Sequence, residues 1–99
     1  MQRNEVIDRL RKHREELETM GVRSLALFGS LARGEENTAN DVDLLVELDP
    51  RRPLGLFEFV AIQHRIEKIL DGVMVDLVVR DALHEELKET ILKEAVPIG

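Results

Sequence analysis

The sequence contains no cysteine, no tryptophan and no tyrosine, and only three phenylalanines in 99 residues. Without cysteine there can be neither disulfides nor thiolate metal sites, as is usual in a reducing cytoplasm. The shortage of aromatic rings removes the stacking platforms of single-strand nucleic-acid binders. No apolar run approaches the ~20 residues that span a bilayer, and the charged N-terminal segment lacks the apolar centre of a signal peptide. We therefore expect a soluble, cytoplasmic protein without membrane contact.

Positive charge is also in deficit, since the formal net charge is −6. An acidic domain lacks the basic surface that grips the phosphates of long nucleic acid, whereas it suits a protein that binds cations. The apolar fraction of 43% and the charged fraction of 34% are those of an ordinary globular domain. The length allows one hydrophobic core. We expect a single domain over residues 1–99, with a core small enough that a homo- or hetero-oligomer could stabilise it.

Hydrophobic patterns predict an alternation of helices and strands. Apolar residues at helical spacing indicate amphipathic helices, and short apolar or alternating runs indicate strands. The run VMVDLVV is apolar enough for a central strand buried on both faces. Helices are expected over residues 4–20, 56–70 and 81–94, and strands over 24–28, 41–48 and 73–79.

Two details sharpen this prediction. Asp81 can cap the last helix, and the helix over 56–70 presents a core stripe. The stripe consists of Leu56, Phe59, Val60, Gln63, Ile66 and Leu70. The expected fold is in the α/β (α+β) class, a small mixed sheet of three or more strands with helices packed on one face.

Asp41 and Asp43 occupy alternate positions of one predicted strand, so both side chains lie on one face, roughly 6–7 Å apart. Such close like charges repel unless a cation lies between them. Paired carboxylate oxygens suit a hard divalent ion such as Mg²⁺. A pair of this kind is also explained by Asp41 in a polar turn and Asp43 facing solvent.

Asp76 is the single charge in VMVDLVV, where burial of a carboxylate without a partner would be costly. A strand end or a salt bridge to an arginine would explain it. Alternatively, its strand lies beside the strand of Asp41 and Asp43, and Asp76 supplies a third metal ligand.

Gly29 and Ser30 follow the first predicted strand and are expected to open a short helical turn. Backbone N–H groups and a serine hydroxyl at such a turn can bind an anion, although a plain tight turn has the same sequence. The spacing to Gly34 matches the start of a P-loop, which then requires lysine. Glu35 and Glu36 stand there instead and exclude a P-loop.

Together these segments resemble a known family. LFGSLARGEENTANDVDLLVEL looks like the motif of minimal nucleotidyltransferases in the polymerase-beta-like superfamily, and VDLV with Asp76 looks like the strand of their third carboxylate. The closing KEAVPIG also resembles the usual end of these domains, so the resemblance covers nearly the whole chain. One departure is Asn40, where the family usually has serine; asparagine is a similar turn former.

The resemblance implies the polymerase-beta-like fold and a set of site residues. Asp41, Asp43 and Asp76 would be catalytic and would hold two Mg²⁺ ions, with Mn²⁺ as an alternative. Gly29, Ser30 and Arg33 would bind the nucleotide. Arg33 has a second explanation, a surface salt bridge to Glu35 or Glu36.

The implied function is metal-dependent transfer of a nucleoside monophosphate, AMP from ATP, to a hydroxyl of a partner protein. Family members this short resemble the antitoxin of HEPN/MNT toxin–antitoxin pairs, whose partner is a HEPN-type ribonuclease toxin. The alternative is a binding module without catalytic function that neutralises the toxin by direct contact.

Overall fold

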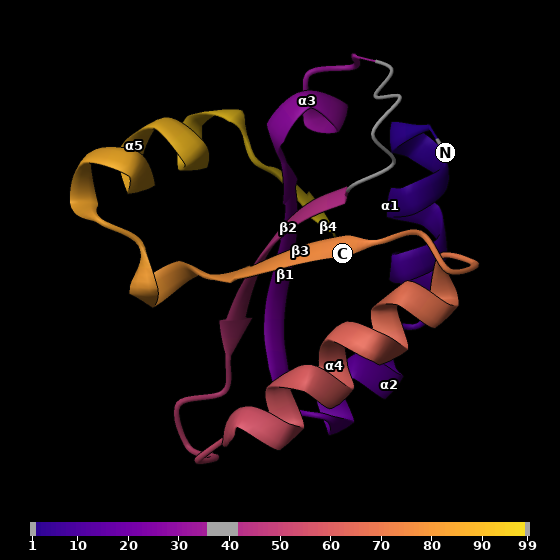
Figure 1. The fold of residues 1–99 in the computed structure, drawn as a ribbon, viewed down its shortest axis with the longest axis vertical. Helices are drawn as coiled ribbons and strands as arrows, with labels where there is room; N and C mark the ends of the chain where they lie inside the picture. Colours follow the sequence, from indigo (N-terminus) through magenta and orange to yellow (C-terminus); the bar gives the residue numbers. More distant parts are fainter. Residues whose placement is uncertain (1, 36–41, 99) are drawn as a thin grey trace.

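The computed structural model describes residues 2–35 and 42–98. The strands are β1 (Val22–Phe28), β2 (Val42–Leu48), β3 (Val75–Val79) and β4 (Val96–Ile98). The helices are α1 (Arg3–Lys12), α2 (Arg14–Thr19), α3 (Gly29–Ala32), α4 (Leu56–Ile69) and α5 (Glu85–Glu94), with a 3₁₀ turn η1 (Arg80–Ala82). The strand order is β3–β2–β1–β4; β1 is antiparallel to β2 and β4, whereas β2 and β3 are parallel (Figure 1). The fold class expected from the sequence is confirmed.

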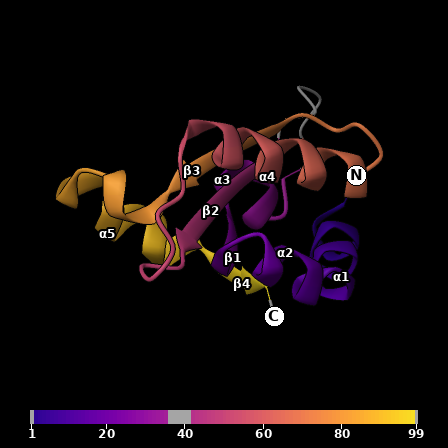
Figure 2. The same cartoon turned by 90° about the horizontal axis from the view of Figure 1, so that it is seen from below.

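The core lies between the sheet and the helices α1, α2 and α4, which cover one of its faces (Figure 2). Leu10, Leu27, Leu44, Ile62 and Ile66 are all at most 1% exposed. Full burial of such a side chain contributes about 1.5–3 kcal/mol, so these contacts fix how the sheet and helices meet. Helix α5 lies on the other side of the sheet (Figures 1 and 2). The expected packing of helices on one face is therefore correct for α1, α2 and α4 but not for α5.

The helical segments differ from the predictions at two breaks. The helix expected over 4–20 is divided at His13, whose N–H donates to Leu10 O, three residues back, at 3.1 Å. The helix expected to be capped by Asp81 begins only at Glu85, because Leu83 and His84 are extended with ψ near 140°. Asp81 lies in η1 instead.

β3 is an edge strand, and the prediction of a central strand buried on both faces is wrong. β2 is its only neighbour among the described strands, and α4 covers one face alone (Figure 2). Asp76 is consequently exposed. The strand nevertheless lies beside β2, so that part of the alternative expectation is confirmed. The metal-ligand role of Asp76 stays a prediction.

The predicted core stripe of α4 is partly wrong. Ile66 and Leu70 are buried, but Leu56 is 74% exposed because it lies in the first turn, away from the core. Within residues 2–35 and 42–98, no helix is both long and apolar enough to cross a membrane.

Candidate functional site

The candidate site lies on the side of the sheet opposite α1 and α4, which we call the site face. Asp43 and Leu45 alternate with the core residues of β2, as the sequence predicts. Leu45 is 4% exposed but does not belong to the main core cluster, because it lies on this second face. Asp43 is half-buried.

Asp43 and Asp76 are direct partners across the parallel pair of β2 and β3. Neighbouring strands lie about 4.8 Å apart, and directly paired residues share a face of the sheet. Two carboxylates from separate strands therefore lie side by side on the site face. This juxtaposition requires the β2–β3 register and could not be deduced from either segment alone.

Gly29 begins α3 directly against Asp43. Its φ is +78°, which side chains other than glycine's rarely adopt. A Cβ built on Gly29 would collide with the Asp43 carboxylate. Glycine is thus required twice, by the backbone conformation and by the close approach. The prediction that Gly29 and the half-buried Ser30 open a short helical turn is confirmed.

Asp41 lies outside the described residues. Among the residues that are described, no group of three histidine, cysteine, aspartate or glutamate side chains is gathered as a metal site. The two carboxylates that do meet, Asp43 and Asp76, are hard oxygen donors of the kind that Mg²⁺ and Mn²⁺ prefer. The Asp43 carboxylate lies where a side chain of Gly29 would be, so its oxygens are held directly at the start of α3. These residues fit a divalent cation.

Arg33 directly follows α3 and is engaged by two carboxylates. Its Nε donates to Glu35 at 3.5 Å, and one terminal nitrogen donates to Glu94 of α5 at 3.1 Å. Glu35 first, and then Glu94, raise the pKa of the Arg33 guanidinium. The surface salt bridge that the sequence suggested for Arg33 is therefore observed with Glu35. Glu94 is a second partner that the sequence did not reveal.

Arg3 is a residue that the sequence analysis missed. Its side chain donates to the backbone carbonyl of Ala32, the last residue of α3, at 3.1 Å. Arg3 thereby connects α1 to the turn that begins at Gly29. No sequence signal identifies this contact, because the two residues are 29 positions apart.

Comparison with known proteins identifies the family to which the chain belongs. The model of the nucleotidyltransferase domain family matches residues 10–98. The protein adenylyltransferase MntA of Thermococcus cleftensis is 38% identical over 88 residues, which cover 88% of this chain and 86% of that protein.

Solved structures are similar as well. One described as a candidate minimal nucleotidyltransferase has a TM-score of 0.73 and 34% identity, covering 98% of this chain and 96% of that chain. The complex of tri-AMPylated Shewanella oneidensis HEPN toxin with MNT antitoxin matches with a TM-score of 0.60 and 17% identity, covering 90% of this chain and 68% of that chain. The latter similarity concerns the fold alone.

Proposed function

Because this chain belongs to the nucleotidyltransferase domain family, we propose that it transfers AMP from ATP to a hydroxyl group of a partner protein. The observation that carries the proposal is the pairing of Asp43 with Asp76 beside Gly29. The acceptor proposed is a HEPN-type toxin, as in the solved complex from Shewanella oneidensis. This chain would then be the antitoxin of the pair.

Asp43 and Asp76, with Asp41, would hold the divalent cations, two Mg²⁺ ions in the form proposed. When bound, the cations neutralise triphosphate charge and lower the pKa of the acceptor hydroxyl. Ser30 and the backbone N–H groups after Gly29 would bind the terminal phosphates. Arg33, now paired with Glu35 and Glu94, could add a charge-assisted contact to the phosphates if those pairs open.

The chemical step is a single in-line displacement. The acceptor oxygen forms a bond to the α-phosphorus of ATP, and the bond from that phosphorus to the bridging oxygen of the β-phosphate breaks. Pyrophosphate leaves, and the hydroxyl proton passes to Asp76 or to solvent. Asp43 and Asp76 orient the reacting groups, which is the main source of catalysis in phosphoryl-type transfers.

The test is co-expression with the product of the neighbouring gene. Mass spectrometry of that product should find an added adenylyl group, which the Asp41→Asn/Asp43→Asn variant should fail to add. Purified components should lose the transfer in excess chelator and recover it with Mg²⁺ or Mn²⁺. Complete neutralisation of the toxin by the double variant, with no adduct in any sample, would contradict the proposal.

That contradicting result would favour neutralisation by contact alone. Apolar side chains exposed at the start of α4 are the observation that supports this second function. Phe57 is 88% exposed and Leu56 74% exposed, and large apolar groups at a surface are common in protein interfaces.

A further prediction concerns Arg3. Arg3→Met removes the donor to Ala32 O and leaves the end of α3 less firmly held. We expect the KM for ATP to rise about fivefold, which corresponds to the roughly 1 kcal/mol of one hydrogen bond, with kcat little changed. Steady-state kinetics measure both constants, and Arg11→Met, an exposed cation of the same helix, is the control. An unchanged KM would show that Arg3 does not support the phosphate turn.

A further inference from the structure

The backbone of Val75, the residue before Asp76, is held by two side chains of α4. Gln63 Nε2 donates to the Val75 carbonyl at 3.0 Å. The Val75 N–H donates to Glu67 Oε2, also at 3.0 Å. Gln63 and Glu67 are four positions apart, so they project from the same side of the helix. Side chains of a single helix thus bind both the N–H and the C=O of Val75.

These two bonds take the place of a neighbouring strand. Val42 N–H donates to Met74 O at 2.9 Å, so the Met74 carbonyl is directed toward β2. Because successive residues of a strand direct their backbone groups to alternate sides, the N–H and C=O of Val75, the first residue of β3, are directed away from β2. No described strand lies on that side. The polar groups of an edge strand normally face water or another chain. Here α4 satisfies them, and α4 is fixed in turn by the fully buried Ile62 and Ile66.

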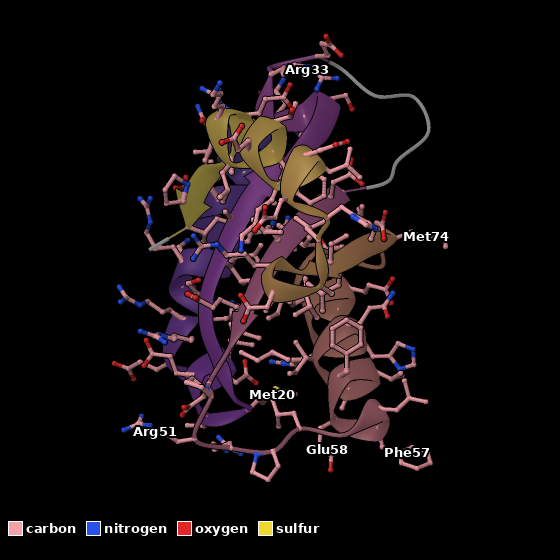
Figure 3. All side chains as sticks on the ribbon, turned by 90° about the vertical axis from the view of Figure 1, so that its left-hand side faces the viewer. Met20, Arg33, Arg51, Phe57, Glu58 and Met74 are labelled. Carbon is pink, nitrogen blue, oxygen red and sulfur yellow. The ribbon has the colours of Figure 1, made fainter. Side chains whose placement is uncertain are left out.

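Asp76 is at a position where such support matters. It is the second residue of a five-residue edge strand. Met74, the residue before that strand, is 67% exposed and lies at the surface in Figure 3. Ends of this kind open locally at low free-energy cost. The like charge of the paired Asp43 adds repulsion that favours separation of the strands. The bonds from Gln63 and Glu67 oppose both tendencies one residue away from the carboxylate.

We propose that Gln63 and Glu67 are positioning residues, which hold Asp76 in register with Asp43 so that the pair can bind a divalent cation. This inference rests on the proposed function, in which Asp76 is a metal ligand. Neither residue touches the cation or the nucleotide. Their effect passes through the backbone of Val75.

The first experiment measures binding of Mn²⁺ to the protein without nucleotide. Gln63→Met/Glu67→Met should weaken Mn²⁺ affinity about 10–100-fold, the range for partners that orient metal ligands. Glu67→Gln removes the same charge as Glu67→Met but keeps an oxygen that can accept from Val75 N–H. Affinity should therefore remain close to that of the parent in Glu67→Gln. His64→Ala, an exposed position on the same helix, is the control.

If Gln63 and Glu67 merely stabilised the fold, their loss would also weaken Mn²⁺ binding. The same substitutions are therefore repeated in a protein that also carries Asp76→Asn. If Gln63 and Glu67 act through Asp76, they cause no further loss of Mn²⁺ affinity once that ligand is gone. Faster amide hydrogen exchange at Asp76 and Leu77 in the Met variants, with unchanged exchange at Leu27, would add support. Should the double variant fail to fold, Gln63→Met alone serves for each comparison.

Two results would overturn the inference and are distinguishable. An equal loss of affinity in the parent and Asp76→Asn backgrounds, or a Glu67→Gln variant as weak as Glu67→Met, would reject positioning and leave the metal role of Asp76 intact. Normal Mn²⁺ affinity in Asp76→Asn itself would reject that metal role, and the positioning inference with it.

Discussion

Asp43→Asn should lower the rate of AMP transfer by more than about 100-fold while the protein stays folded. Loss of a residue that merely orients a metal ligand costs about 10–100-fold, so loss of a direct ligand should exceed that range. Asparagine has nearly the shape of aspartate and keeps the β1–β2 pairing, in which residue 43 faces Phe28. The defect should therefore appear in metal-dependent transfer, measured with a fixed acceptor and saturating ATP.

The same variant should be as stable as the parent or more stable when metal is removed. Asp43 and Asp76 are direct partners across two strands, and like charges placed opposite each other destabilise a sheet. Urea unfolding in excess chelator measures the difference. Added Mn²⁺ should reverse the order, because it stabilises only the chain that binds it.

Glu47→Gln is the matched control for Asp43→Asn. It makes the same chemical change on the same strand, where Glu47 pairs with Ser24 and Arg80 away from Gly29. Transfer should stay within a few-fold of the parent. A folded Asp43→Asn protein with normal transfer would reject Asp43 as a metal ligand.

Gly29→Ala should have the second largest effect, again a loss of transfer beyond about 100-fold, since it should displace a metal ligand rather than a residue that orients one. An added methyl group would meet the Asp43 carboxylate, so either the carboxylate or the start of α3 has to move. Both shifts separate the proposed phosphate turn from the proposed metal ligands. The positive φ adds a stability cost of about 1–2 kcal/mol.

Gly34→Ala separates these two effects. Gly34 has a φ of +81°, close to the +78° of Gly29. Apart from its two chain neighbours, however, no atom of the described residues lies within 4 Å of a Cβ built on Gly34. Both variants should lose similar stability in thermal unfolding, whereas only Gly29→Ala should lose transfer. Equal transfer in the two variants would mean that the contact with Asp43 has no catalytic importance.

The features that depend on local pattern could be predicted from the sequence. Alternation along β2 correctly assigns Asp43 and Leu44 to opposite faces, and a strand followed by Gly29-Ser30 correctly indicates a helical turn. Each of these two conclusions follows from side-chain periodicity or from the backbone freedom of glycine. That the strand of Asp76 lies beside β2 was one of two alternatives left open by the sequence, and local pattern did not decide between them.

The features that depend on long-range pairing could not be predicted. β4 has only three residues, one of them Pro97, which is too short for a periodic signal and is tolerated because the strand lies at an edge. The apolar run around Asp76 suggested that this residue is buried. Local sequence does not specify the order of the strands, and in the observed order β3 is at an edge, where Asp76 is exposed. The sequence did contain one sign of this pairing. Gln63 is a polar residue in the otherwise apolar stripe of α4, and its side chain binds the backbone of β3.

The parallel pairing of β2 and β3 also has a kinetic consequence. All of α4 separates the two strands in sequence, so Asp43 and Asp76 meet only after the whole crossover has closed. Closure of such non-local pairs is slow, because the chain loses loop entropy before their contacts form. During refolding from denaturant, helical circular dichroism should therefore recover before Mn²⁺ binding does. A newly made chain would therefore be unable to bind the cation through both carboxylates until β2 and β3 have paired.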